Sequence, residues 1–94
     1  MKISGIIWLR EIVEKINRKH RVVHEELREI LRGSSHFRFV EKGLRRGENV
    51  YAAMGQTDAG RYLIVFFVYK KSRQALILSA RDMTASERKR YAKK

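Results

Sequence analysis

Several side chains in this chain suit metal-free chemistry on an RNA phosphodiester. When the 2′-hydroxyl attacks the neighbouring phosphorus, the reaction needs a base, an acid and cations that stabilise the phosphorane. Arginine and lysine supply such cations, and histidine, glutamate and tyrosine can move the protons. The candidates of these types are His20, Arg61, Arg81, Glu87, Arg88 and Tyr91, with Lys19 next to His20.

Each of these residues also has a purely structural interpretation. His20 falls on an apolar helical stripe and can be a half-buried packing residue. Arg81 can pair with a nearby carboxylate, and Glu87 can belong to a helix-capping box. Tyr91 can pack on a sheet with its hydroxyl in water. The base stays open between His20 and Glu87, and the acid between His20 and Tyr91.

The sequence contains no motif that is typical of other catalytic chemistries. His20, His24 and His36 form no ligand set with nearby carboxylates, so we expect no metal site. No glycine-rich phosphate loop is present, and we expect no cofactor. The chain contains no cysteine, which excludes disulfides and thiolate metal sites.

The charge of the chain points to a polyanionic partner. There are 22 Lys and Arg residues against 10 Asp and Glu, a formal net charge of +12. From Arg61 onward ten basic residues face two acidic ones, so most of the excess lies in the last third. Nucleic acid, an acidic protein or anionic lipid would fit this charge. Beside the catalytic candidates, we expect RNA contacts from Lys19, Lys70, Lys71, Arg73, Lys89 and Arg90.

A hairpin near the C-terminus is the expected centre of the fold. The apolar runs Tyr62–Tyr69 and Ala75–Ala80 flank the polar stretch Lys70–Gln74, which predicts a β-hairpin. The first run is apolar at both alternating sets of positions, as in a central strand covered on both sides. Arg81 and Asp82 are then expected at the exit of the second strand.

The remaining segments predict one α+β domain over residues 1–94. Thr84, with Glu87 three residues later, has the form of a capping box that starts a basic helix. The other expected elements are a short strand or extended entry at Ser4–Trp8, helices at Leu9–His20 and His24–Arg32, strands at His36–Val40 and Asn49–Gly55, a loop at Glu41–Glu48 and a turn at Gln56–Gly60. This order predicts two N-terminal helices packed on a mainly antiparallel sheet meander, followed by the basic C-terminal helix.

Nothing in the sequence favours a membrane. The longest apolar run is too short to span a bilayer, and the apolar N-terminal stretch has no cleavage site of a signal peptide. The basic residues also lack a companion helix with an exposed apolar face, so we expect no membrane partner. The cytoplasm is the expected location.

In several stretches the chain resembles the BrnT family, the small ribonuclease toxins of bacterial type II toxin–antitoxin pairs. The matching stretches are Trp8, KINRKHRV at 15–22, EELREIL at 25–31, VYAAMGQTDAGRYLIVFF at 50–67 and ILSARDMTASERKRY at 77–91. The last stretch is the most specific. The Lys-His-x-Val corner followed by two glutamates comes second.

The resemblance implies a compact fold similar to the RelE-like ribonucleases, and metal-independent RNA cleavage that inhibits translation. It also implies a cognate ribbon-helix-helix antitoxin, BrnA-like, that forms an oligomer with the toxin and neutralises it. The family pattern falls on Lys19, His20, Arg61, Arg81, Glu87, Arg88 and Tyr91.

Two positions depart from that pattern. Many relatives have Trp-Asp where this chain has Trp8-Leu9, and glycine where it has Arg21. The first change removes a carboxylate, and the second alters the corner beside His20.

Two hypotheses about function follow. In the first, the chain is a toxin ribonuclease in which Arg81, with Arg61 or Arg88, stabilises the phosphorane. In the second, the chain is a non-catalytic basic module that binds nucleic acid or an acidic antitoxin.

Overall fold

The computed structural model describes residues 1–33, 36–43 and 47–93. Within them the chain is an α+β protein with three helices and a five-stranded mixed sheet. In chain order the elements are β1 (Gly5–Ile7), α1 (Arg10–His20), α2 (His24–Arg32), β2 (His36–Glu41), β3 (Val50–Gln56), β4 (Tyr62–Tyr69), β5 (Gln74–Asp82) and α3 (Ala85–Ala92). The loop expected at Glu41–Glu48 falls in part on residues 44–46, which lie outside the described residues.

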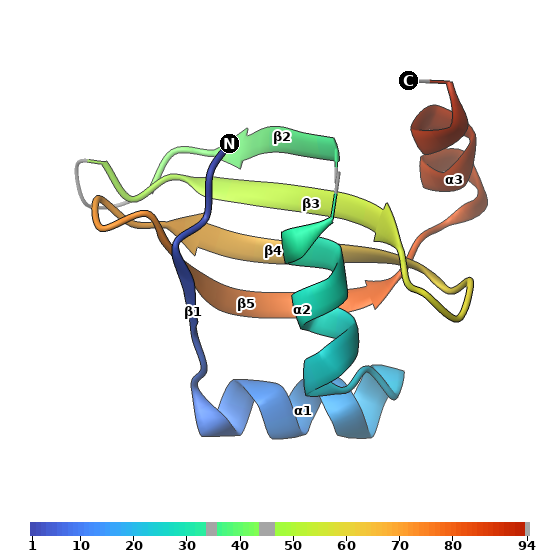
Figure 1. Ribbon diagram of the computed structural model, residues 1–94, viewed down its shortest axis with the longest axis horizontal. Coiled ribbons are helices and arrows are strands. Elements are labelled where there is room, and N and C mark those ends of the chain that lie inside the picture. Colours follow the sequence, from blue (N-terminus) through green and yellow to red (C-terminus); the bar gives the residue numbers. More distant parts are fainter. Residues whose placement is uncertain (34–35, 44–46, 94) are drawn as a thin grey trace.

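The sheet has the strand order β1-β5-β4-β3-β2 (Figure 1). The four strands from β2 to β5 form an antiparallel meander, as the sequence predicts. The short strand β1 pairs in parallel with β5, from Gly5 opposite Gln74 to Ile7 opposite Leu76, and this pairing makes the sheet mixed. The central strand β4 is the expected one, Tyr62–Tyr69.

Helices α1 and α2 contribute to the core on one face of the sheet, which we call the first face. The fully or almost fully buried side chains of Ile16 in α1 and Leu27 and Ile30 in α2 share one cluster with Leu63 and Val65 of β4. Figure 1 shows α2 lying across the sheet and α1 below it. Because side chains alternate along a strand, Tyr62, Ile64 and Phe66 point to the opposite, second face.

A tight corner joins α1 to α2. Helix α1 ends at His20, and Arg21 adopts the left-handed conformation, with φ 53° and ψ 39°. Its N–H donates to the carbonyl oxygen of Asn17, as expected for a helix C-terminus. The next residue, Val22, is completely buried. Left-handed backbone favours glycine, so Arg21 carries a strain that a glycine would not.

Strand β5 and helix α3 are joined more closely than the sequence suggests. β5 continues through Asp82, so Arg81 and Asp82 belong to the strand itself rather than following its exit. The predicted capping box is confirmed: Thr84 Oγ1 accepts from Glu87 N at 3.1 Å, and Glu87 Oε1 accepts from Thr84 N at 2.8 Å. None of the described helices is long and apolar enough to cross a membrane.

Candidate active site

The structure divides the candidate residues between the two faces of the sheet. Asp82 lies opposite Leu63 in the register of β4 and β5, and so belongs to the first face. Arg81 lies opposite Ile64, which belongs to the cluster on the second face. Consecutive residues of a strand point to opposite sides. The two charged residues therefore serve two separate sites.

Arg61 occupies the site on the first face with all of its donor nitrogens engaged. Its Nε donates to Asp82 Oδ1 at 2.8 Å, and Nη2 donates to Asp82 Oδ2 at 3.1 Å. Nη2 also donates to the carbonyl oxygen of His20 at 2.6 Å, and Nη1 to that of Arg21 at 2.7 Å and to Glu26 Oε1 at 3.2 Å. These contacts join α1, α2 and the two ends of the β4–β5 hairpin.

The electrostatics of this group agree with a structural role. Hydrogen bonds from Arg61, opposed by a smaller effect of burial, hold the pKa of the Asp82 carboxyl below its ordinary value. The same pairing raises the pKa of Arg61 above its ordinary value. His20 lies close enough to Asp82 to lower that carboxyl pKa further. With its donors satisfied by two carboxylates and two carbonyls, Arg61 is a brace of the α1–α2 corner.

Arg81 is held on the second face by Glu87 of α3. Nη1 and Nη2 of Arg81 donate to the two carboxylate oxygens of Glu87 at 2.8 and 3.0 Å. Nη1 also donates to the carbonyl oxygen of Asp82, and the guanidinium carbon lies 5.5 Å from the centre of the Phe66 ring. The side chain of Arg81 keeps 34% of its exposure, so solvent and ligands reach its guanidinium.

Glu87 is committed to this ion pair and to the helix cap. The bond from Arg81 contributes most to lowering the pKa of Glu87, from 4.5 to about 2, and the bonds within the Thr84 cap add to it. A carboxylate with so low a pKa is a poor proton acceptor at neutral pH. The structural interpretation of Glu87 as a capping residue is the one that the geometry supports.

Aromatic rings surround the other candidates on α3. The guanidinium carbon of Arg88 lies 4.2 Å from the centre of the Tyr62 ring, a close cation–π contact. The rings of Tyr62 and Tyr91 meet edge to face at 6.1 Å between centres. The ring of His36 meets that of Tyr91 in the same manner at 6.0 Å. We call the group Arg81, Arg88, Tyr62, Tyr91 and His36 the second-face cluster.

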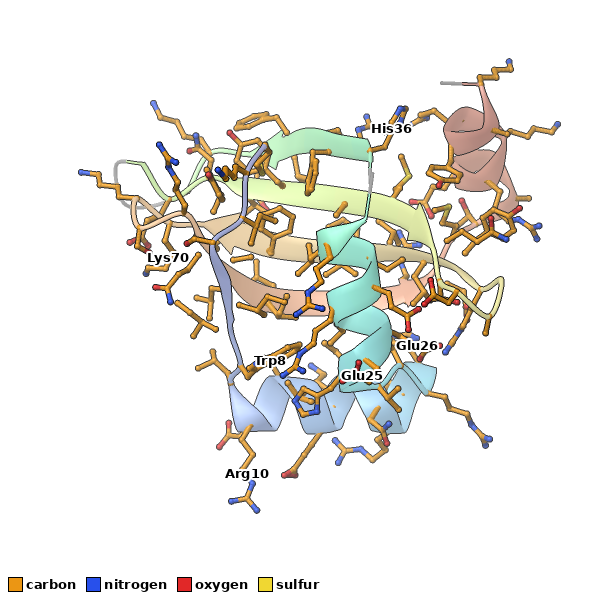
Figure 2. All side chains as sticks on the ribbon, viewed as in Figure 1. Trp8, Arg10, Glu25, Glu26, His36 and Lys70 are labelled. Carbon is orange, nitrogen blue, oxygen red and sulfur yellow. The ribbon has the colours of Figure 1, made fainter. Side chains whose placement is uncertain are left out.

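The predicted RNA-contacting residues lie at different ends of the molecule. Lys89 and Arg90 are exposed on α3, and Lys19 is exposed near the end of α1. Lys70, Lys71 and Arg73 lie at the β4–β5 turn, at the end of the sheet away from α3; Figure 2 labels Lys70 there and His36 beside α3. Lys70 pairs with Glu48 at 3.3 Å, whereas Lys71 and Arg73 are exposed.

Among the described residues, neither the cavity beside the N-terminal segment nor a cluster of metal ligands involves the catalytic candidates. A cavity of about 640 Å³ lies between the N-terminal segment and α2, where Arg28 is stacked on Trp8, and it includes none of the catalytic candidates. Among the residues that the structure describes, no group of three or more histidine, cysteine, aspartate or glutamate side chains could hold a metal ion. The second-face cluster brings arginines, tyrosines and a histidine together on one surface.

Two members of the second-face cluster were not among the sequence-derived candidates, His36 and Tyr62. The alternation of the strand that begins at His36 puts that residue on the same face as Arg38. The alternation of β4 likewise puts Tyr62 with Phe66. Pairing these strands in register would place both on the same face as Arg81, but the register depends on contacts that the sequence does not show.

Comparison with known proteins identifies a family. A family model described as the ribonuclease toxin BrnT of type II toxin–antitoxin systems matches residues 11–87. That match runs from α1 to the first turn of α3. It includes His36, Tyr62 and Arg81 of the second-face cluster and ends one residue before Arg88. A search of curated proteins found no match.

Proposed function

Since this chain belongs to the BrnT family of ribonuclease toxins of type II toxin–antitoxin systems, we propose that it cleaves RNA at the second-face cluster without a metal ion. The observation that carries the proposal is the placement of two arginines and a tyrosine on one surface. Arg81 and Arg88 lie at the end of the sheet, and Tyr91 lies one helical turn from Arg88.

In this proposal the RNA phosphate lies against Arg81 and Arg88. The 2′-oxygen attacks phosphorus, and the guanidinium groups stabilise the added negative charge. The ion pair with Glu87 keeps the Arg81 guanidinium in a fixed position before RNA binds, which reduces the cost of ordering it. The hydroxyl of Tyr91 delivers a proton to the leaving 5′-oxygen. Cleavage of cellular RNA then inhibits translation in the cytoplasm.

A type II toxin has an antitoxin partner. We propose a ribbon-helix-helix antitoxin that forms an oligomer with this chain and neutralises it. The exposed cations of α3, Lys89 and Arg90, favour an acidic segment of that partner. Such a segment would cover the same cations that RNA uses, so RNA and antitoxin would compete.

Cleavage of RNA by purified protein in EDTA tests this function. We expect products with 2′,3′-cyclic phosphate ends, and a loss of about 10²–10³-fold in rate for Arg81→Ala and for Arg88→Gln. Arg10→Gln is the matched control, because it removes an exposed arginine of α1 that belongs neither to the cluster nor to the expected RNA contacts. If both cluster variants fold normally and cleave as fast as wild type, the site is wrongly assigned.

A second candidate function is binding without cleavage. It is favoured by the engagement of both arginines, since Arg81 is paired with Glu87 and Arg88 is stacked on Tyr62. It predicts RNA that stays intact and is bound in a salt-sensitive manner.

A further inference from the structure

His36 lies in the same row of the sheet as Arg81. In the register of the meander, His36 is opposite Met54, Met54 is opposite Ile64, and Ile64 is opposite Arg81. Directly opposed residues point to the same face, so the four side chains cross the second face in one line. Three interstrand spacings put the Cα atoms of His36 and Arg81 about 14 Å apart. His36 and Arg81 therefore lie at the two ends of this row, on either side of the buried side chains of Met54 and Ile64.

Helix α3 packs against this row of side chains, with Tyr91 in contact with the cluster that contains Met54 and Ile64. Tyr91 meets the ring of His36 at 6.0 Å between centres and the ring of Tyr62 at 6.1 Å. Arg88 stacks on the same Tyr62. Figure 2 shows His36 at the end of β2 that faces α3. His36 is half-buried, so part of the residue stays in contact with solvent.

The proposed cleavage still needs a base, and the other candidates are poorly placed for it. Glu87 is bound at both oxygens by Arg81, with a pKa of about 2. His20 belongs to the corner on the first face, where its carbonyl is bound by Arg61 and its side chain lies near Asp82. Imidazole is the side chain that most often accepts protons at neutral pH, and His36 is the imidazole within the second-face cluster.

We propose that His36 is the general base of the RNA cleavage; this inference rests on the function proposed above. The imidazole nitrogen takes the proton of the 2′-hydroxyl as the 2′-oxygen forms its bond to phosphorus. The bond from phosphorus to the 5′-oxygen breaks, its electron pair stays on that oxygen, and the Tyr91 hydroxyl supplies the proton. Water returns a proton to Tyr91 and accepts the one held by His36, so both groups regain their starting state.

His36→Phe tests the assignment, because phenylalanine keeps an aromatic ring against Tyr91 and removes the nitrogens. We expect the rate of RNA cleavage to fall about 10²–10⁴-fold, with thermal stability close to that of wild type. His36→Gln serves as a second variant in case phenylalanine disturbs the fold. The matched control is His24→Phe, since His24 also meets an aromatic ring edge to face, that of Trp8, outside the cluster.

An RNA with sulfur in place of the 5′-oxygen separates base from acid, because a thiolate leaves without a proton. With this substrate we expect His36→Phe to keep its full defect and Tyr91→Phe to recover. Recovery by His36→Phe would make it the acid and overturn the assignment. If both His36 variants cleave RNA as fast as wild type, the role of His36 is overturned and the proposed function stands. A wild-type chain that leaves RNA intact overturns the proposed function, and this inference with it.

Discussion

Arg61 donates hydrogen bonds to both carboxylate oxygens of Asp82, at 2.8 and 3.1 Å, while the same guanidinium donates to the carbonyl oxygens of His20 and Arg21. The contact fastens the corner between α1 and α2 to the end of the β4–β5 hairpin. An arginine bound in this way is not available to a phosphate unless the corner opens. Arg61 and Arg81, two cations of the same hairpin, therefore lie in different surroundings on opposite faces of the sheet.

Loss of this brace is expected to destabilise the fold. Arg61→Gln leaves the backbone carbonyls of His20 and Arg21 without their guanidinium donor, and it removes the ion-pair partner of Glu26, whose side chain is only 21% exposed. We expect the free energy of unfolding to fall by about 2–3 kcal/mol, measured by denaturant titration. Arg10→Gln is the control, because the Arg10–Glu14 pair is largely exposed and its loss should cost less than about 0.5 kcal/mol. Equal effects of the two changes would contradict the brace.

Most of the fold could be predicted from local patterns in the sequence. Burial repeats with the periodicity of a strand or a helix, so the pattern of apolar residues indicates the element. Examples are the apolar run at Tyr62–Tyr69 and the helical spacing of Leu27, Ile30 and Leu31. The capping box from Thr84 to Glu87 depends on two side chains within one turn. Contacts of this kind are close in sequence, so residue types alone indicate them.

The contacts that build the candidate site are distant in sequence, and for that reason local patterns indicate only some of its residues. The pairing of β1 with β5 joins Ile6 to Ala75, and nothing in either segment specifies the other. The sequence does not show which carboxylate holds Arg81, because Asp82 and Glu87 are both nearby. The alternation of β5 puts Asp82 on the other face of the sheet and leaves Glu87 as the partner. Nothing in the sequence links His36 to the site, because its neighbour Tyr91 follows 55 residues later.

The left-handed residue at the α1–α2 corner offers a gain in stability. Arg21 has φ 53°, a conformation that costs a side-chain-bearing residue about 1 kcal/mol more than glycine. Arg21→Gly keeps the carbonyl that Arg61 binds and removes that strain, although glycine makes the unfolded chain more flexible. We expect thermal unfolding to show a net gain of about 0.5 kcal/mol.

Arg18→Gly is the control for this change. Arg18 is an exposed residue inside α1, where glycine costs about 1 kcal/mol of helix stability. The two substitutions remove the same side chain from the same helix end and should act with opposite signs. If both destabilise the protein equally, the conformation of Arg21 carries no strain.

Neutralising the cations of α3 is expected to weaken RNA binding and to make that binding less sensitive to salt. For single-stranded RNA, each lost phosphate contact lowers the slope of log affinity against log salt by about 0.7. The double variant Lys89→Gln with Arg90→Gln leaves Arg88 and Tyr91 in place, so we expect a reduced slope with the cleavage products unchanged. The matched double variant, Lys71→Gln with Arg73→Gln, removes two exposed cations at the opposite end of the sheet.

Titrations with a short and a long RNA separate the two basic regions. The affinity for a short single strand bound at the second-face cluster should fall in the α3 variant and stay unchanged in the turn variant. The affinity for a strand long enough to cross the sheet should fall in both variants, as expected if Lys71 and Arg73 also contact RNA. A short strand that responds only to the turn variant would place the RNA away from α3.

The Arg81–Glu87 ion pair makes the attachment of α3 sensitive to acid. The pKa of Glu87 is lowered from 4.5 to about 2 by Arg81, so the attached helix favours the charged carboxylate. The pair therefore contributes its full stability above about pH 4.5 and loses it as the pH falls toward 2. Because 34% of the Arg81 side chain is exposed, solvent screening limits the effect to about 1 kcal/mol.

Amide hydrogen exchange measures this loss directly. The N–H of Arg88 donates to the carbonyl oxygen of Thr84 in the first turn of α3, so its protection reports the attachment of the helix. We expect protection in wild type to fall between pH 4.5 and pH 2, after correction for intrinsic exchange, and Glu87→Gln to show weaker protection with little dependence on pH. Glu11→Gln, an exposed change in α1, should follow wild type. Wild-type protection that stays constant across this range would mean that α3 is held without the ion pair.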